Sequence, residues 1–373
     1  MSKHEILDPD RPGRRSGIRR LTLRPAADRR PGGEGSGLGA AGDGQDWSAI
    51  KDQLRRTVRR VPEVVITVQG SRIAKHDDHF AIAGVLRYMM YISRNGQLIT
   101  TDEQNARIEG TDAMRDTHGA WNLDMQRMRS GKGEALHPTF NFIFSMPAKT
   151  EPDKLLDAVQ VFAREHFAGH QYVMALHTPE TEPGRKKDKS PEHPHVHLVL
   201  RAENDNGQRI YIRKGDLRAW RATFAALLRA RGIEANASSR AERGKSLKSM
   251  RGAEWHIDKR YQEKMARGEA AERSKAKGAR LREAAQELQE GRTEPKRWEL
   301  AMTARRRDVL RELAQNAERL RQEGDNELAD QVDRFMQDMR PLDSERRQMQ
   351  RALIKQVQIR VVERGLDREE DGR

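Results

Sequence analysis

Residues 193–200, HPHVHLVL, place histidines at every second position of a segment that otherwise has the composition of a buried strand. Side chains alternate between the two faces of a β-strand, so the imidazoles point to one face and the valine and leucines between them point to the other. Neutral imidazoles that face the same way are common ligands of divalent metals. The pattern therefore predicts a strand within a sheet and a metal centre on one face of that sheet.

Strand geometry limits which histidines can share one ion. Residues i and i+2 are about 6.5 Å apart and can converge on a metal, whereas residues i and i+4 are about 13 Å apart and generally cannot. We therefore expect His195 and His197 to be ligands and His193 to orient its neighbours. The third ligand must come from another element. His177, at the end of the apolar run 172–176, is the best candidate because a neighbouring antiparallel strand would bring it alongside. The alternative is that these histidines are merely packed.

Apolar patterning predicts the fold class. Segments rich in β-branched and aromatic residues predict strands at 63–69, 139–146, 172–176, 196–200 and 209–212. Segments with apolar residues at helical spacing predict helices at 79–93, 151–167 and 215–231. Because these elements interleave irregularly, we expect an α+β domain whose antiparallel sheet is covered by helices. An extended, charged, coiled-coil-like α-helical region follows it, interrupted at Pro295 and Pro341.

Composition divides the chain and limits its partners. Residues 1–45 are rich in Arg, Pro and Gly and predict a disordered basic arm, followed by a catalytic domain at 46–248 and the helical region at 249–373. The formal net charge is +14, which favours a polyanion such as nucleic acid. The absence of cysteine excludes thiolate metal sites. No run of 18 apolar residues occurs, so we expect no membrane insertion.

Two further features suggest how a metal centre could act on nucleic acid. Residues 201–250 carry 12 Lys and Arg against 5 Asp and Glu, and Arg213, Lys214 and Arg218 are candidate contacts to a phosphate backbone. Tyr88 and Tyr91 end a predicted helix next to arginines, and a tyrosine near a metal can attack phosphorus and retain a covalent bond. Water would suffice for a hydrolytic nuclease, so these residues alone leave both reactions open.

Four segments together resemble a known family. The runs 91–98 (YISRNGQL), 139–147 (TFNFIFSMP), 193–200 (HPHVHLVL) and 237–244 (ASSRAERG) occur in the same order and with comparable spacing in conjugative relaxases of the HUH superfamily, MOB-P type. The chain is similar in particular to the mobilisation nuclease branch that includes the T-DNA border endonuclease of tumour-inducing plasmids. The resemblance covers residues 62–245, and the HPHVH and SSRAERG blocks together are specific.

The resemblance implies site-specific and strand-specific nicking and religation at the origin of transfer of a plasmid or integrative element. A tyrosine attacks the scissile phosphate and keeps a 5′-phosphotyrosyl bond, with a divalent metal, Mg²⁺ or Mn²⁺, as cofactor. By position, Tyr91 corresponds to the nucleophile, with Tyr88 as the second choice. The implied metal ligands are His177, His195 and His197, and the implied DNA contacts are Ser145, Arg94 and Arg240.

One departure from the family pattern concerns the general base. Family members commonly have an acidic residue two positions after the first histidine, where this chain has Pro179, and residues 178–192 form a longer charged insertion. Glu192, immediately before His193, is our first candidate for the base, and Glu180 is the second.

The resemblance also implies partners and a location. We expect single-stranded origin DNA, relaxosome accessory proteins and a type IV secretion coupling protein as partners. The expected location is the bacterial cytoplasm, with export in covalent attachment to DNA. Two alternative classes stay open: an HUH-type rolling-circle replication initiator or transposase, and a non-catalytic DNA-binding accessory protein.

Overall fold

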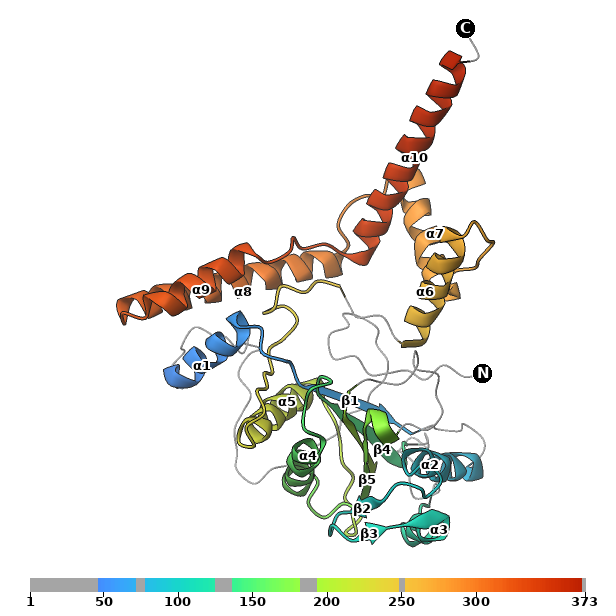
Figure 1. Ribbon diagram of the computed structural model, residues 1–373, viewed down its shortest axis with the longest axis vertical. Coiled ribbons are helices and arrows are strands. Elements are labelled where there is room, and N and C mark those ends of the chain that lie inside the picture. Colours follow the sequence, from blue (N-terminus) through green and yellow to red (C-terminus); the bar gives the residue numbers. More distant parts are fainter. Residues whose placement is uncertain (1–45, 72–77, 125–135, 182–192, 248–251, 371–373) are drawn as a thin grey trace. The chain divides into compact units, whose positions relative to one another are not determined.

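A computed structural model describes residues 46–71, 78–124, 136–181, 193–247 and 252–370 (Figure 1). The described chain forms two compact units. The first holds its described residues between Arg59 and Ala237, and the second holds the helix α1 (Trp47–Val58) together with residues from Ser238 onward. The predicted arm at 1–45 lies outside the described residues. The functional boundaries at 46–248 and 249–373 stay a prediction.

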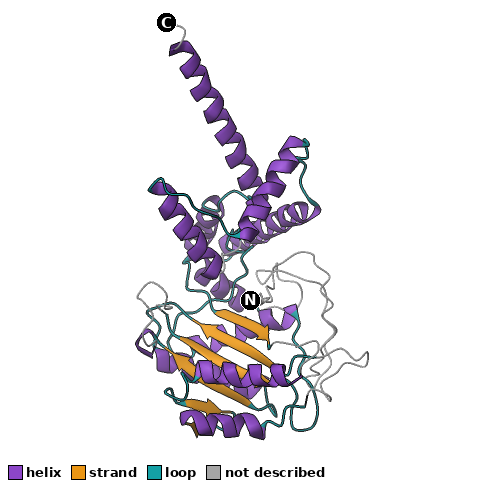
Figure 2. Cartoon of the chain, turned by 90° about the vertical axis from the view of Figure 1, so that its right-hand side faces the viewer, coloured by secondary structure: helices purple, strands orange, loops and turns teal. Residues whose placement is uncertain are grey.

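The first unit is built on a six-stranded sheet in the order β1-β4-β6-β5-β2-β3, with antiparallel neighbours throughout. Figure 2 shows its strands side by side in orange, with helices packed on the sheet. The strands are β1 (Val65–Gly70), β2 (Thr100–Asp102), β3 (Arg107–Ile108), β4 (Thr139–Ser145), β5 (Tyr172–His177) and β6 (His195–Arg201). The predicted α+β class with an antiparallel sheet and C-terminal helices is confirmed.

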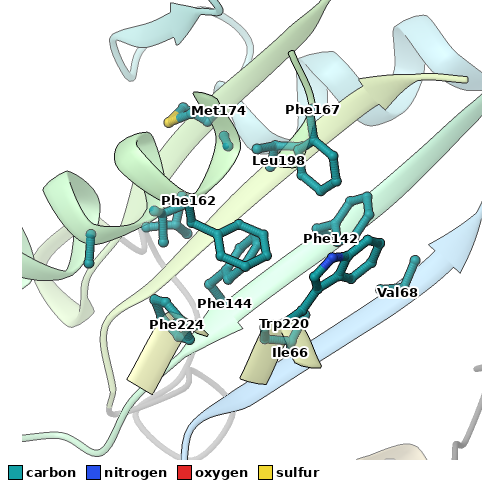
Figure 3. Close-up of a cluster of buried hydrophobic side chains, with 14 of the residues drawn as sticks. Ile66, Val68, Phe142, Phe144, Phe162, Phe167, Met174, Leu198, Trp220 and Phe224 are labelled. Atoms are coloured by element: carbon teal, nitrogen blue, oxygen red, sulfur yellow. The ribbon is translucent and has the colours of Figure 1, made fainter. Parts of the chain in front are cut away.

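Alternation along β6 separates the two faces of the sheet. Val196, Leu198 and Leu200 face the helices α4 (Pro152–His166) and α5 (Lys214–Arg229), within the main hydrophobic core. Figure 3 shows this core, where Phe142 and Phe144 of β4 lie among Phe162, Phe167, Trp220 and Phe224. Burial of such aromatic side chains contributes most of the stability of a domain of this size. His195 and His197 occupy the alternate positions of β6, so their side chains point to the other face of the sheet.

Two helices lie on that second face. These are α2 (Asp78–Ile92) and α3 (Gly110–Ala120), which pack over Val173 and Ala175 of β5 and Val199 of β6. Val85, Met89 and Ile92 form the buried stripe of α2, at the spacing of one helix face. Packing this stripe on β5 brings the C-terminal end of α2 over the face of the sheet that carries His195 and His197.

One sequence-based expectation differs from the structure. Residues 209–212 form no strand: Arg209 makes a single isolated bridge with Glu203 around the turn at Gly207. A strand needs a continuous ladder of partners, and β-branched composition alone does not provide one. The short strands β2 and β3 and the helix α3 were not predicted, because neither the strands of two or three residues nor the polar helix shows a clear period.

The second unit is helical, and its later helices are α6 (Gly252–Ala266), α7 (Lys275–Gln289), α8 (Arg297–Gln322), α9 (Asn326–Gln337) and α10 (Glu345–Glu370). Pro295 and Pro341 lie between helices, as expected. Leu313 and Leu320 of α8 pack with Val332 of α9 and with Leu54 of α1. No helix of the described residues has the length and apolar character needed to cross a membrane.

Candidate metal and tyrosine site

The adjacent strands β5 and β6 bring the three predicted metal ligands together. His177 at the end of β5 lies directly opposite His195 at the start of β6, and His197 follows two residues later on the same face. Their ring centroids are 5.2 Å apart for His177 and His195, 5.0 Å for His195 and His197, and 4.5 Å for His177 and His197. One ligand atom from each side chain lies within 4.8 Å of those of the other two, and all three residues are buried.

Each of the three rings has one nitrogen engaged with a group outside the histidine cluster. His177 Nε2 donates to the carbonyl oxygen of Ile92 (2.7 Å), and His195 Nδ1 donates to the carbonyl oxygen of His193 (3.2 Å). His197 Nδ1 lies 3.0 Å from the hydroxyl oxygen of Tyr88. A metal-bound histidine commonly has its other ring nitrogen engaged in this way.

The electrostatics of His197 suit a neutral metal ligand. Its Nε2 is buried and has no hydrogen-bond partner in the described structure, as expected for a nitrogen that binds an ion. Desolvation by burial, followed by the nearby His177, His195 and Arg94, lowers the pKa of His197 to about 2. The ring is therefore neutral at physiological pH, and the cluster can hold a divalent metal.

Two tyrosines of α2 lie over the cluster but differ in exposure. The ring of Tyr91 is 40% exposed, and its centroid lies 5.9 Å from that of His197 and 6.4 Å from that of His177. Tyr88, one turn earlier, is half-buried, and burial, followed by the neighbouring Tyr91, raises the pKa of its hydroxyl. The hydroxyl of Tyr88 therefore keeps its proton, and Tyr91 is the tyrosine that an external strand can reach.

A tight turn after α2 carries Arg94 back to the site. Arg94, Asn95 and Gly96 all have positive φ, and the amide nitrogen of Leu98 closes the turn by donating to the carbonyl oxygen of Ser93 (2.9 Å). Arg94 Nη2 donates to His177 Nδ1 (3.1 Å), and the guanidinium carbon lies 5.1 Å from the centroid of the Tyr91 ring. The predicted DNA contact Arg94 is thus part of the histidine and tyrosine cluster.

Ser145 and His193 also lie beside the cluster. Ser145 ends β4 directly opposite His195, so a row of opposed residues crosses three strands from Ser145 through His195 to His177. His193 contributes its carbonyl oxygen to His195, and its ring centroid lies 5.8 Å from that of His195. His193 therefore contacts His195 through both its backbone and its ring.

Other predicted residues lie elsewhere. Arg213 and Arg218 are exposed on or next to α5, which packs on the opposite face of the sheet from the histidines. Lys214 is the first residue of α5, and Arg240 belongs to the second compact unit. Glu192 lies outside the described residues. Glu180 is exposed in the short 3-10 helix Pro179–Thr181, and a hydrogen bond with Thr178 lowers the pKa of its carboxyl.

In the site as a whole, an antiparallel sheet presents three buried histidines beneath a helix with an exposed tyrosine. Residues 91–233 match the family model described as "Relaxase: MobA/VirD2-like, nuclease domain". This part of the chain is therefore similar to relaxase nuclease domains, and it contains Tyr91 and the histidine cluster.

Two further comparisons complete these findings. A solved chain from the structure described as "Molecular Basis of Vancomycin Resistance Transfer in Staphylococcus aureus" has 14% sequence identity and a TM-score of 0.29. The alignment covers 48% of this chain and 99% of that chain, and at this TM-score we draw no conclusion from it. No curated protein matches the chain.

Proposed function

We propose that the protein nicks and rejoins one DNA strand at an origin of transfer by metal-assisted tyrosine transesterification, with Tyr91 as the nucleophile. The observation that carries this proposal is the exposed Tyr91 ring above the buried cluster of His177, His195 and His197. The match of residues 91–233 to a relaxase nuclease domain supports nicking for conjugative transfer over the replication-initiator, transposase and accessory-protein alternatives.

The proposed reaction exchanges one phosphate ester for another. The oxygen of Tyr91 attacks the scissile phosphorus, a bond forms between that oxygen and phosphorus, and the bond from phosphorus to the 3′-oxygen breaks. The leaving 3′-oxygen takes up a proton, and the 5′-phosphate stays on Tyr91. The reverse attack by a 3′-hydroxyl rejoins the strand. Because ester is exchanged for ester, neither direction needs ATP.

Different residues of the site have different roles in the proposed reaction. The three imidazoles would hold a divalent metal, which would supply Lewis-acid polarisation of a phosphate oxygen. Arg94 places a cation beside the Tyr91 ring, where it can stabilise the phenolate and the phosphate that approaches it. Tyr91 must lose its proton during the attack, and Glu192 stays our proposal for the acceptor. Ser145, Arg213, Lys214, Arg218 and Arg240 stay proposals as DNA contacts.

We further propose Mn²⁺ in preference to Mg²⁺ as the ion. Magnesium prefers oxygen ligands and retains water, whereas divalent ions of the first transition series, of which Mn²⁺ is the weakest binder, accept imidazole nitrogen more readily. Three histidine ligands therefore favour Mn²⁺ over Mg²⁺.

The proposed partners and location follow from this function. Single-stranded origin DNA is the substrate, relaxosome accessory proteins and a type IV secretion coupling protein are partners, and the protein acts in the bacterial cytoplasm before export attached to DNA. The formal net charge of +14 supports the nucleic-acid partner.

The test uses labelled single-stranded oligonucleotides that tile the DNA on both sides of the chain's own gene. They are incubated with the full chain and Mn²⁺ and resolved on a denaturing gel. We expect one oligonucleotide to give an SDS-resistant adduct that disappears in Tyr91→Phe. Cleavage without an adduct would identify a hydrolytic nuclease, and binding without cleavage would identify an accessory protein.

A further inference from the structure

His197 differs from the other two histidines in the group that its outer nitrogen contacts. The outer nitrogens of His177 and His195 donate to backbone carbonyls, which no substitution removes. His197 Nδ1 instead lies 3.0 Å from the hydroxyl of Tyr88, a side chain. The ring centroids of Tyr88 and His197 are 6.1 Å apart, and the rings meet edge to face.

We propose that Tyr88 is a positioning residue of the metal site: its hydroxyl oxygen accepts a hydrogen bond from Nδ1–H of His197 and so keeps the Nε2 lone pair of that ring directed at the metal. The inference rests on the metal-dependent function proposed above. It gives Tyr88 a role distinct from that of the nucleophile.

The two neutral tautomers of His197 have different consequences at this site. With the proton on Nε2, a donor would be buried without a hydrogen-bond partner, which is unfavourable. With the proton on Nδ1, the ring donates to Tyr88, and Nε2 presents a lone pair. The Tyr88 hydroxyl therefore selects the tautomer that can bind a cation, as a carboxylate or carbonyl does beside many metal-bound histidines.

The position of Tyr88 on α2 separates it from Tyr91. The two tyrosines are three residues apart, so they lie on adjoining parts of one helix face, with ring centroids 5.8 Å apart. The hydroxyl of Tyr88 is turned inward to His197, whereas the Tyr91 ring is 40% exposed. One helix turn thus supplies an inner tyrosine for the metal ligand and an outer one for the DNA.

Tyr88→Phe removes the hydroxyl and keeps the ring. We expect isothermal titration of the full chain with Mn²⁺ to show binding 10–100-fold weaker than wild type, the usual effect of losing an outer partner of a metal ligand. The DNA adduct should fall at limiting Mn²⁺ and recover at saturating Mn²⁺. Tyr172→Phe, which removes another buried tyrosine hydroxyl on the opposite face of the sheet, should leave Mn²⁺ affinity unchanged.

The ring nitrogens of His197 give a second readout that does not depend on activity. In ¹⁵N spectra of the metal-free chain, we expect wild-type His197 to carry its proton on Nδ1 and Tyr88→Phe to shift toward the Nε2 tautomer. A wild-type ring protonated on Nε2 would overturn the inference even if the variant proved too unstable to titrate.

Wild-type Mn²⁺ affinity in Tyr88→Phe would also overturn it, either with the adduct retained or with the adduct lost at every Mn²⁺ concentration. The latter would make Tyr88 the nucleophile. Failure of the proposed function would give a different result, because the wild type would then bind Mn²⁺ and form no adduct. The comparison of Mn²⁺ affinities would still decide the role of Tyr88.

Discussion

Arg94 donates a hydrogen bond from Nη2 to Nδ1 of His177 across 3.1 Å, so a cation lies against the ring nitrogen of His177 that does not contact the carbonyl oxygen of Ile92. This nitrogen is the one left to bind a metal, because Nε2 of the same ring already donates to the carbonyl oxygen of Ile92. A metal ion must therefore displace the guanidinium and overcome repulsion from its charge.

Arg94→Gln should separate metal binding from DNA chemistry. We expect Mn²⁺ affinity to rise by about tenfold, or ~1.4 kcal/mol, because a competing cation is removed, and adduct formation to fall because Tyr91 loses its neighbouring charge. Titration calorimetry and the adduct assay measure the two effects. Arg87→Gln on the same helix, whose side chain lies over Phe80, is the matched control and should change neither. Weaker Mn²⁺ binding in Arg94→Gln would contradict the competition.

Gly96 should be far less tolerant of alanine than another glycine of similar backbone conformation. Its φ is +77°, and an added Cβ would lie 2.4 Å from the carbonyl carbon of Gly110. Gly207 has a φ of +72° and nothing within 4 Å of the same position. We expect Gly207→Ala to cost about 1 kcal/mol and Gly96→Ala at least twice that in unfolding free energy, measured by urea denaturation. Equal losses would show that the turn relaxes around the new methyl group.

Acid should destabilise the metal-free protein through buried histidines such as His170. Burial is the main cause that lowers the pKa of His170 below its ordinary value of 6.5, although its ring contacts the carbonyl oxygen of Arg201. The unfolded chain then binds more protons below pH 6.5, so the stability contributed by the neutral ring is complete above that pH and is lost as the pH falls below it, by at most about 1.4 kcal/mol per pH unit.

His170→Asn tests this dependence, because the amide can still donate to the carbonyl oxygen of Arg201. We expect urea midpoints measured with chelator between pH 8 and pH 5.5 to fall less steeply for the variant than for wild type. Identical slopes would assign the acid sensitivity to other groups.

Arg346 should be essential to the helical unit. Its side chain is buried and pairs with Glu287 through Nε (2.6 Å) and with Glu299 through Nη1 (2.8 Å). Removing a buried cation leaves two carboxylates without it, so Arg346→Met should cost about 3–5 kcal/mol. Arg351→Met breaks an exposed pair with Asp343 and should cost less than about 1 kcal/mol. Thermal unfolding of both variants measures the difference, and similar losses would contradict it.

The sequence was most informative where the two-residue period of a strand coincided with metal-binding side chains. Alternation in 193–200 predicted the strand β6, its buried face and its histidine face together, and the apolar run before His177 indicated the neighbouring strand. The contact between the helix residue Tyr88 and the strand residue His197 could not be predicted in this way. The contact between Tyr88 and His197 depends on how α2 crosses β5 and β6, and that crossing is set by the packing of Met89 and Ile92.

Sequence reasoning also missed features with little local signal. The outer partners of His177 and His195 are backbone carbonyls of Ile92 and His193, which any residue type would provide. The packing of α1 with α8 and α9 joins segments far apart in the chain, and the stripe of Ile50 and Leu54 shows only that the helix needs a partner. Both the outer partners of the histidines and the packing of α1 depend on tertiary contacts, which the local sequence does not show.

The most direct test of the proposed function identifies the tyrosine that carries the DNA. Trypsin cleaves after Arg87 and Arg94, so a single peptide, YMMYISR, contains both candidate tyrosines. The covalent complex formed with Mn²⁺ and a cleaved oligonucleotide is digested with nuclease and trypsin, and the peptide is fragmented in a mass spectrometer. We predict the residual 5′-phosphonucleotide on Tyr91 and an unmodified Tyr88. A nucleotide on Tyr88, or on a residue outside this peptide, would contradict it.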